Sequence, residues 1–319
     1  MEKEKAKRYF ITALVILLGI LAVIASVLVW IASNHTPRDE AVLHGENGTP
    51  VMSYSENMIS LSLTSPQGFV YDVSNDTIIY TKGQERVVYP GSTTKLLSAL
   101  YALTLLDPNE TVTPGNELQL VREGSSIAYI KSHHSLTVEM LVQAMLIPSG
   151  NDASYVLAAA AGRRLSGDED TDGKSAVEHF MSGLRKYASD IGLCGTSLTV
   201  PDGYDGSSHY TTTEDMIIVA RLALQNDIIR KYASMPKASV VYASGHTNEW
   251  INTNKLLDKD GEFYSEYVTG LKTGSIGGEY SLIFSFSFAD GREYIAGVFG
   301  AGDKDARFRD ALKMIEELK

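Results

Sequence analysis

The chain has 319 residues, of which 44% are hydrophobic, so it can form one large or two modest domains with a sizeable core. Its formal net charge of -11 argues against nucleic acid as a partner, because such binding depends mainly on lysine and arginine. The single cysteine, Cys194, excludes an intramolecular disulfide and a cysteine-based zinc site, and its apolar neighbours predict a buried side chain that is not a nucleophile.

Residues 10–32 contain no charged side chain and would span about 35 Å as a helix, enough to cross a bilayer. Four basic residues precede this run: Lys3, Lys5, Lys7 and Arg8. We therefore expect a cytoplasmic tail over residues 1–9, a single transmembrane anchor over 10–32, and the rest of the chain outside the cytoplasm at the cell membrane. A cleaved signal peptide is the alternative, but the apolar run is long for one, and Trp30 or Ile31 would stand where cleavage needs a small residue.

After this segment the composition changes twice. Residues 33–61 are polar and broken by prolines and glycines, which predicts an extracytoplasmic stalk. Residues 67–83 hold two short apolar runs around a polar turn at 74–76, the pattern of a β-hairpin. A helix is then predicted to begin near Gly91 and to end before Asp107.

The middle of the chain, from about residue 135 to residue 228, is predicted to be mainly helical. The apolar spacing and the breaks at proline and glycine predict helices over about 137–147, 152–164 and 175–191, and another that begins at Thr213.

Strand patterns return after this helical block, at 239–243, 267–272, 280–288 and 293–299. In 280–288 aromatic and aliphatic residues alternate with serines, which predicts a strand with one buried face. An amphipathic helix from Asp303 closes the chain. This order of elements predicts an α+β domain over 62–319, with a sheet flanked by helices and an inserted helical subdomain over about 107–230.

Ser92 and Lys95 are the first candidate catalytic pair. Residues three apart on a helix share a face, so the hydroxyl and the amine can touch. Lysine can take a proton from serine only after it has lost its own, which requires burial or a second cation nearby. Ser234 and Lys237 have the same spacing, but the intervening Pro236 argues against a shared helical face. The spacing alone therefore does not identify a nucleophile.

Two further stretches complete a set. Ser149 and Asn151 stand at a break between predicted helices, and Lys272, Thr273 and Gly274 end a predicted strand, where a glycine lets a ligand backbone approach closely. The order Ser-x-x-Lys, Ser-x-Asn, Lys-Thr-Gly is the signature of active-site serine β-lactamases and penicillin-binding proteins.

The chain from about residue 62 to residue 319 resembles the D-alanyl-D-alanine carboxypeptidases, the low-molecular-weight penicillin-binding proteins. Besides the three motifs, the similar stretches are LTVEMLVQAMLIPSGNDASYVLA, GLCGTSLTVPDGYDGSSHYTTTEDM, and NTNKLL followed by GLKTG. The resemblance implies the α+β fold of β-lactamases and DD-peptidases, with an antiparallel sheet.

The resemblance also implies roles for these residues. Ser92 would attack the penultimate D-alanine of a peptidoglycan stem peptide, and Lys95 would take its proton, its amine pushed toward neutrality by Lys272. Ser149 and Lys272 would pass a proton to the departing D-alanine. Water would release the acyl-enzyme, so no metal or organic cofactor is implied, and β-lactams would act as covalent inhibitors.

The substrate-binding residues follow in the same way. Asn151 would hold the substrate's amide and Thr273 its terminal carboxylate, Gly274 would let the substrate approach, and the backbone amides of Ser92 and Ser275 would form the oxyanion hole. Many relatives carry a histidine where this chain has Ser275. An arginine that grips the carboxylate in some relatives has no clear counterpart, since Thr253 stands in the place expected for it.

Three alternatives stay open. The same chemistry with another acceptor gives a DD-transpeptidase, an endopeptidase or a β-lactamase-like hydrolase. A membrane-anchored sensor that binds muropeptides or β-lactams without turnover is the non-enzymatic reading. Residues 168–173, DEDTDG, match the first half of a calcium loop, but His179 stands where the bidentate glutamate should fall, which favours a solvated acidic loop.

Overall fold

The computed structural model of the protein describes residues 52–319. The predicted cytoplasmic tail, the membrane anchor and most of the predicted stalk lie outside the described residues. Within 52–319 no helix combines the length and the apolar character needed to cross a bilayer.

The stalk prediction, which ran to residue 61, is wrong at its end. Ser53–Tyr54 form strand β1, which pairs in parallel with β3 (Thr77–Lys82) at the edge of the main sheet. The backbone amide of Ile59 also donates to Ile79 O at 2.9 Å. These residues belong to the domain because the edge of β3 offers hydrogen-bond acceptors to their backbone.

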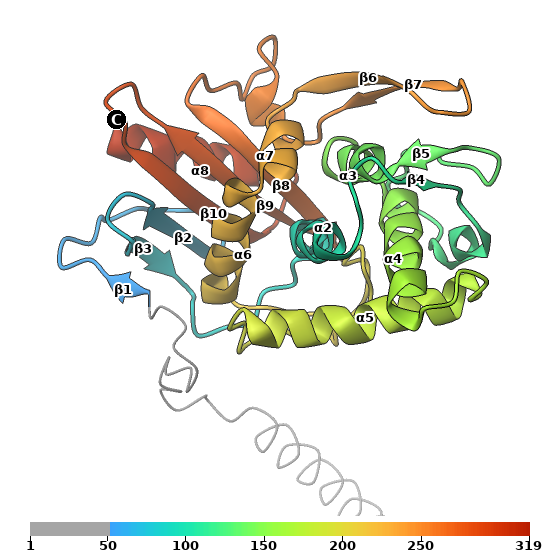
Figure 1. Ribbon diagram of the computed structural model, residues 1–319. Helices are drawn as coiled ribbons and strands as arrows, with labels where there is room; N and C mark the ends of the chain where they lie inside the picture. The colour runs from blue at the N-terminus through green and yellow to red at the C-terminus, as the bar shows by residue number, and fades with distance from the viewer. Residues whose placement is uncertain (1–51) are drawn as a thin grey trace, which may run out of the picture. The chain divides into compact units, whose positions relative to one another are not determined.

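The sheet has six strands in the order β1-β3-β2-β10-β9-β8 (Figure 1). The remaining strands are β2 (Gln67–Asp72), β8 (Val268–Ile276), β9 (Glu279–Ser287) and β10 (Glu293–Ala301). All pairs except β1 with β3 are antiparallel. Both predicted hairpins, over 67–83 and over 280–299, are confirmed.

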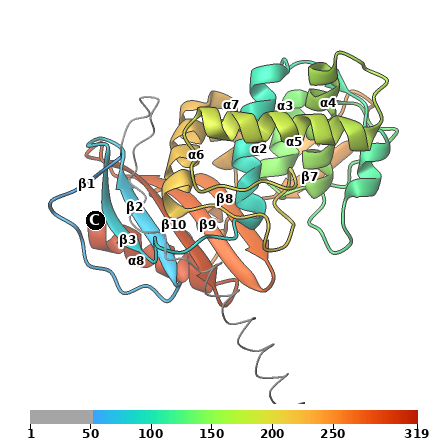
Figure 2. The same ribbon diagram turned by 90° about the horizontal axis from the view of Figure 1, so that it is seen from below.

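The sheet is covered on both faces. Helix α8 (Ala306–Leu318) packs on β9 and β10 from one side, and α6 (Thr213–Gln225) packs on β2 and β10 from the other (Figure 2). The prediction of a half-buried strand over 280–288 is therefore wrong, because Ser281 and Ser285 are as buried as the phenylalanines beside them. The Ser285 hydroxyl is satisfied by Thr269 Oγ1 at 2.7 Å, which allows serines to line the second face.

The helices between β3 and β8 confirm the predicted helical block. They are α2 (Thr94–Leu105), α3 (Val138–Leu146), α4 (Asn151–Ser166), α5 (Gly173–Asp190), α6 and a short α7 (Asp227–Ala233) that was not predicted. Short 3₁₀ turns lie at Gly91–Thr93 (η1), Asn116–Leu120 (η2) and Lys255–Leu257 (η3). Two small hairpins pair Thr111–Val112 (β4) with Leu136–Thr137 (β5), and Lys237–Val241 (β6) with Thr247–Ile251 (β7).

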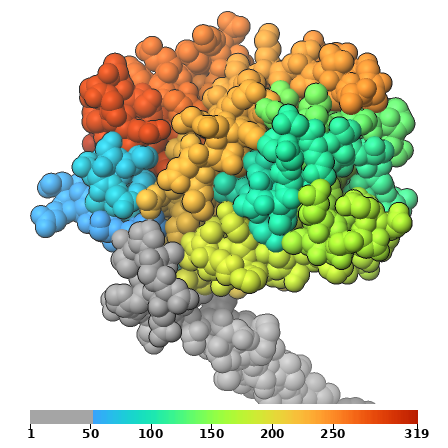
Figure 3. All heavy atoms as spheres, in the orientation of Figure 1, coloured from blue at the N-terminus to red at the C-terminus, as the bar shows by residue number. Residues whose placement is uncertain are grey.

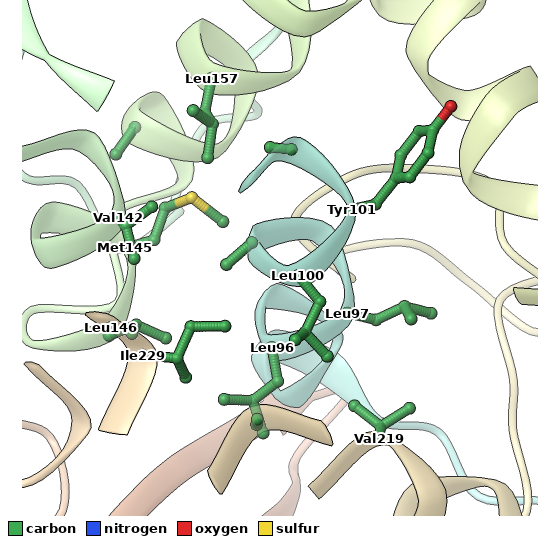
Figure 4. Close-up of a cluster of buried hydrophobic side chains, with 14 of the residues drawn as sticks. Leu96, Leu97, Leu100, Tyr101, Val142, Met145, Leu146, Leu157, Val219 and Ile229 are labelled. Atoms are coloured by element: carbon green, nitrogen blue, oxygen red, sulfur yellow. The ribbon is translucent and has the colours of Figure 1, made fainter. Parts of the chain in front are cut away.

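Helix α2 lies in the middle of the helical block. Leu96, Ala99 and Ala102 are fully buried, and Figure 4 shows Leu96, Leu97 and Leu100 among side chains from α3, α4, α6 and α7. Every residue from Thr94 to Ala102 is buried, so the first turns of this helix are held rigidly.

Segments from the two ends of the described chain lie together. Strand β2 pairs with β10, and Figure 3 shows the blue and cyan segment of the early strands against the red C-terminal segment. Helix α8 is fixed to the segment before β2 by Asp310, whose buried carboxylate accepts hydrogen bonds from Thr64 N at 2.9 Å and Ser65 N at 2.7 Å.

We expect Asp310→Ala to lower the free energy of unfolding by about 2 to 3 kcal/mol, because two backbone amides at a buried site lose their acceptors. Urea unfolding of the variant and the parent protein measures this difference. Glu316→Ala, an exposed change on the same helix, is the control and should alter stability little. Equal losses in the two variants would contradict the anchoring role of Asp310.

Candidate active site

Ser92 lies in the 3₁₀ turn η1, directly before α2. The predicted contact is present, with Lys95 Nζ 2.7 Å from Ser92 Oγ. Gly91 has a φ of +51°, and a Cβ there would approach Ser275 N to 2.9 Å, so glycine suits both the turn and the close passage of strand β8. Ser234 and Lys237, the decoy pair with the same spacing, do not share a helix, since Ser234 is the C-cap of α7 and Lys237 begins β6.

The Lys95 amine is completely buried and lies among three oxygens. It donates to Ser92 Oγ and to Asn151 Oδ1, each at 2.7 Å, and to Asp202 O at 3.2 Å. Burial lowers the pKa of Lys95 to about 8, while the negative charges of Asp202 and Asp152 act in the opposite direction. A lysine with this pKa is partly neutral near pH 8 and can then accept the Ser92 proton.

Lys272 lies on β8, is also buried, and donates to Thr273 O at 3.2 Å. Burial is the main cause that holds the pKa of Lys272 well below the ordinary lysine range, and the positive charges of Lys95 and Arg307 add to it. From the sequence we expect Lys272 to help activate Lys95. Burial is the leading cause of the lowered pKa of both amines, and the repulsion between Lys95 and Lys272 adds to it.

Strand β8 brings Thr273, Gly274 and Ser275 beside Ser92. A Cβ on Gly274 would stand 2.3 Å from Pro90 O, so only glycine permits this approach of the strand to the serine turn. Ser275 is exposed near the end of the strand. A tight turn follows at Gly277 and Gly278, both of which have positive φ. The strand and η1 are therefore held at backbone contact distance.

Ser149 and Asn151 enter from the break between α3 and α4. Ser149 is buried and has a φ of +64°, unusual for a residue with a side chain. Asn151 is the first residue of α4, and its backbone amide donates to Ser126 O at 2.8 Å. Asp152 accepts from Ala128 N and Ile130 N at 2.8 and 2.9 Å, which fixes the loop on this side of the site.

These segments surround a cavity of about 310 Å³. Of the predicted site residues, six line it: Ser92, Ser149, Asn151, Thr273, Gly274 and Ser275. Lys95 and Lys272 are buried and do not line it. The rest of the lining is mostly polar and includes Tyr204, Thr253 and Arg307.

Arg307 is the residue that the sequence argument missed. It comes from the first turn of α8, and its Nη1 donates to Gly274 O at 2.7 Å and to Ser281 O at 3.2 Å. Burial lowers the pKa of Arg307 to about 10, so it keeps its charge at neutral pH. An arginine therefore does border the cavity, although not at the position where one was expected. Thr253 stands at that position, with 2.6 Å between its Oγ1 atom and that of Thr273.

A sequence signal for Arg307 existed. Ala311 and Met314 follow it by four and seven residues and are fully buried, so Arg307 stands on the buried stripe of α8. A charged side chain is rarely buried without polar partners, and here Arg307 borders a polar cavity.

The prediction of a buried Cys194 is wrong. The chain bends at this point because Asp215 accepts from Cys194 N and from Gly195 N, at 3.3 and 2.8 Å. Leu193 and Gly195 turn inward, and the thiol is left exposed.

The acidic stretch 168–173 begins the helix α5. Asp172 is its N-cap and accepts from Lys174 N, while Asp168 Oδ1 accepts from Asp170 N. Within residues 52–319 no group of three or more His, Cys, Asp or Glu side chains is placed to hold a metal ion.

The chain is similar to proteins of known family. A family model described as D-alanyl-D-alanine carboxypeptidase matches residues 55–302. The D-alanyl-D-alanine carboxypeptidase of Streptomyces sp. (strain K15) is 29% identical over 259 residues, covering 78% of this chain and 84% of the relative. DacF of Bacillus subtilis (strain 168), a D-alanyl-D-alanine carboxypeptidase, is 28% identical over 254 residues, which are 76% of this chain and 60% of DacF.

Solved structures agree with the sequence relatives. The Streptomyces K15 DD-transpeptidase has a TM-score of 0.72 at 26% identity, with 82% of this chain and 98% of that chain covered. Penicillin-binding protein D2 of Listeria monocytogenes, solved in an ampicillin-bound form, has a TM-score of 0.65 at 26% identity, with 81% and 99% covered.

Proposed function

The chain belongs to the D-alanyl-D-alanine carboxypeptidase family, and on that premise we propose that it removes the terminal D-alanine from peptidoglycan stem peptides through an acyl-enzyme on Ser92. The observation that carries the proposal is the contact between Ser92 Oγ and the buried amine of Lys95, at the floor of a cavity that also holds Arg307. If Ser92 only capped the helix and Lys95 were a surface residue, the amine would not be buried and the serine would not line a cavity.

The acylation step follows from this contact. Lys95 takes the proton from Ser92 Oγ, which attacks the carbonyl carbon of the penultimate D-alanine. The C–N bond to the terminal D-alanine then breaks, and its nitrogen receives a proton through Ser149 and Lys272, both beside the cavity. Water later hydrolyses the ester on Ser92 and releases the shortened peptide.

Backbone amides serve as the oxyanion hole. The carbonyl oxygen of the substrate acquires negative charge as Ser92 attacks, and the N–H groups of Ser92 and Ser275 are the donors we assign to it. One such donor contributes roughly 3 kcal/mol in comparable sites. A Cβ on Gly91 would stand 2.9 Å from Ser275 N, and this close approach of η1 and β8 supports the pairing of donors from the two elements.

The terminal carboxylate of the substrate is assigned to Arg307 and Thr273. Both line the cavity, and the Arg307 guanidinium keeps a buried Nε without a partner among the described residues. A carboxylate there would gain a charge-assisted hydrogen bond and balance the buried cation. Asn151, whose oxygen is bound by Lys95, has its amide group for the substrate backbone.

The acceptor of the acyl group is proposed to be water. The similarity to a protein named as a DD-transpeptidase supports an amine as the second candidate acceptor. β-Lactams are proposed to acylate Ser92, in line with the ampicillin-bound form of the Listeria relative.

Incubation of the protein with diacetyl-Lys-D-Ala-D-Ala should release D-alanine, and a fluorescent penicillin should label it covalently. Ser92→Ala should lose both activities by more than about a thousandfold, because the nucleophile is absent. Ser234→Ala, the serine of the decoy pair, is the matched control and should keep both. A folded parent protein that neither releases D-alanine nor forms a penicillin adduct on Ser92 would refute the enzymatic proposal, and transfer to added glycine would identify an amine acceptor.

Arg307→Gln should lower kcat/KM for the same peptide by about tenfold to a hundredfold, the effect of losing a hydrogen bond to a charged group. The parent protein should prefer the peptide with a free carboxylate over its C-terminal amide, and the variant should lose this preference. Arg309→Gln changes an exposed arginine on the same helix, paired with Asp303, and should behave like the parent. An undiminished preference in Arg307→Gln would exclude the carboxylate role.

We also propose that residues 10–32 anchor the protein in the cell membrane, with the catalytic domain outside the cytoplasm. The uncharged run and the basic residues before it support this. The full chain should remain in the membrane fraction after alkaline carbonate washing, and a variant that lacks residues 10–32 should not. Release of the full chain by carbonate would argue against a spanning anchor.

A further inference from the structure

Asp202 is a buried acidic residue beside the catalytic lysine, and no role has been assigned to it above. It lies in the segment between α5 and α6, is 1% exposed, and its main-chain oxygen accepts from Lys95 Nζ at 3.2 Å. Two contacts fix this segment to α2. Ser98 Oγ donates to Pro201 O at 2.7 Å, and His209 Nε2 lies 2.9 Å from Thr94 Oγ1.

The Asp202 carboxylate is only half satisfied by the fold. Its Oδ1 accepts from Tyr204 N at 3.1 Å, but Oδ2 is buried with no hydrogen-bond partner among the described residues. Asp152, the other buried carboxylate near Lys95, accepts three backbone amides, from Ala128, Ile130 and Ala153. Asp152 is therefore explained by the loop that it fixes, whereas a buried, half-satisfied Asp202 is unfavourable for folding alone.

The proposed chemistry at Ser92 requires a negative charge near Lys95. Lys95 becomes an ammonium when it takes the Ser92 proton, and it does so at a fully buried site. An ammonium there is unfavourable unless an anion balances it. The carboxylates that act on Lys95 are Asp202, with the larger effect, and Asp152.

We propose that Asp202 is a positioning residue for acylation, whose carbonyl orients Lys95 and whose carboxylate stabilises the ammonium that forms when Ser92 gives up its proton. The inference rests on the proposed function of Ser92 and Lys95. The proton moves from Ser92 Oγ to Lys95 Nζ and is not passed to Asp202, whose carboxylate acts as the buried carboxylate does beside histidine in serine proteases.

The sign of the pH effect follows from the charges around the two groups. The charges of Asp202 and Asp152 act on Lys95, Lys95 acts on Lys272, and the charge of Asp202 also acts on Arg122 and Tyr155. Acylation requires neutral Lys95, so its rate rises with pH through the pKa of Lys95. Loss of the Asp202 charge lowers that pKa further. In a plot of acylation rate against pH, the rising part at low pH (the acid limb) then moves to lower pH. The rate at the high-pH plateau falls, because Lys95 is then a weaker base.

The rate of acylation of the full chain by a fluorescent penicillin, measured from about pH 5 to about pH 10, tests this inference. Asp202→Asn should move the acid limb to lower pH by about one unit and lower the plateau rate about tenfold. The variant should consequently differ less from the parent at acid pH than at alkaline pH. A purely structural role would lower the rate at every pH and leave the limb in place.

Matched variants separate charge from packing. Asp202→Glu keeps a carboxylate and should keep the parent's acid limb even if its rate falls. Asp205→Asn removes a carboxylate three residues away, which binds Arg122 and Thr199, and should leave the limb unchanged. If thermal unfolding shows that Asp202→Asn does not fold, Asp202→Ser, whose hydroxyl can still accept from Tyr204 N, carries the same expectation.

The outcomes distinguish this inference from the proposed function. An unshifted acid limb in a folded Asp202→Asn or Asp202→Ser protein would overturn the role of Asp202 and leave the carboxypeptidase proposal intact. A parent protein that is not acylated at any pH would refute the proposed function itself, and with it the inference about Asp202.

Discussion

The site depends on one constraint, a lysine amine that is kept out of water. Lys95 reaches Ser92, Asn151 and Asp202 only because α2 is packed on all sides and begins directly beneath the cavity. The same burial that makes this helix rigid also lowers the pKa of Lys95 to about 8. Stability and reactivity therefore have one physical origin here, since apolar packing around α2 removes the solvent that would keep the amine charged.

Three segments distant in sequence converge on Ser92, and glycines make the convergence possible. A Cβ on Gly203 would stand 1.9 Å from Gly91 O, and a Cβ on Gly274 would stand 2.3 Å from Pro90 O. Because these side chains are absent, β8 and the Asp202 segment can pass the serine turn at backbone contact. The backbone donors and the lysines that we assign to catalysis are thereby brought together around one cavity.

Periodicity in the sequence predicted most of the fold. The two hairpins, α2 to α6 and α8 follow from apolar spacing and from breaks at proline and glycine, which are local signals. The failures share a different cause. The burial of both faces of β9 and the inclusion of β1 in the sheet depend on neighbours far along the chain, and Cys194 is exposed because Asp215 holds a local bend. A pattern within one segment contains no information about such partners.

The sequence by itself determined which chemistry is available, because Ser92, Lys95, Ser149, Asn151 and Lys272 are recognisable by type, order and predicted element. It could not decide what surrounds them. Only the tertiary structure brought Arg307 from the last helix into the cavity, made burial the main cause of the lowered pKa of Lys95, and placed Asp202 beside that amine. The physical reason is that burial and charge balance are properties of the space around a group, and that space is filled by residues more than a hundred positions away.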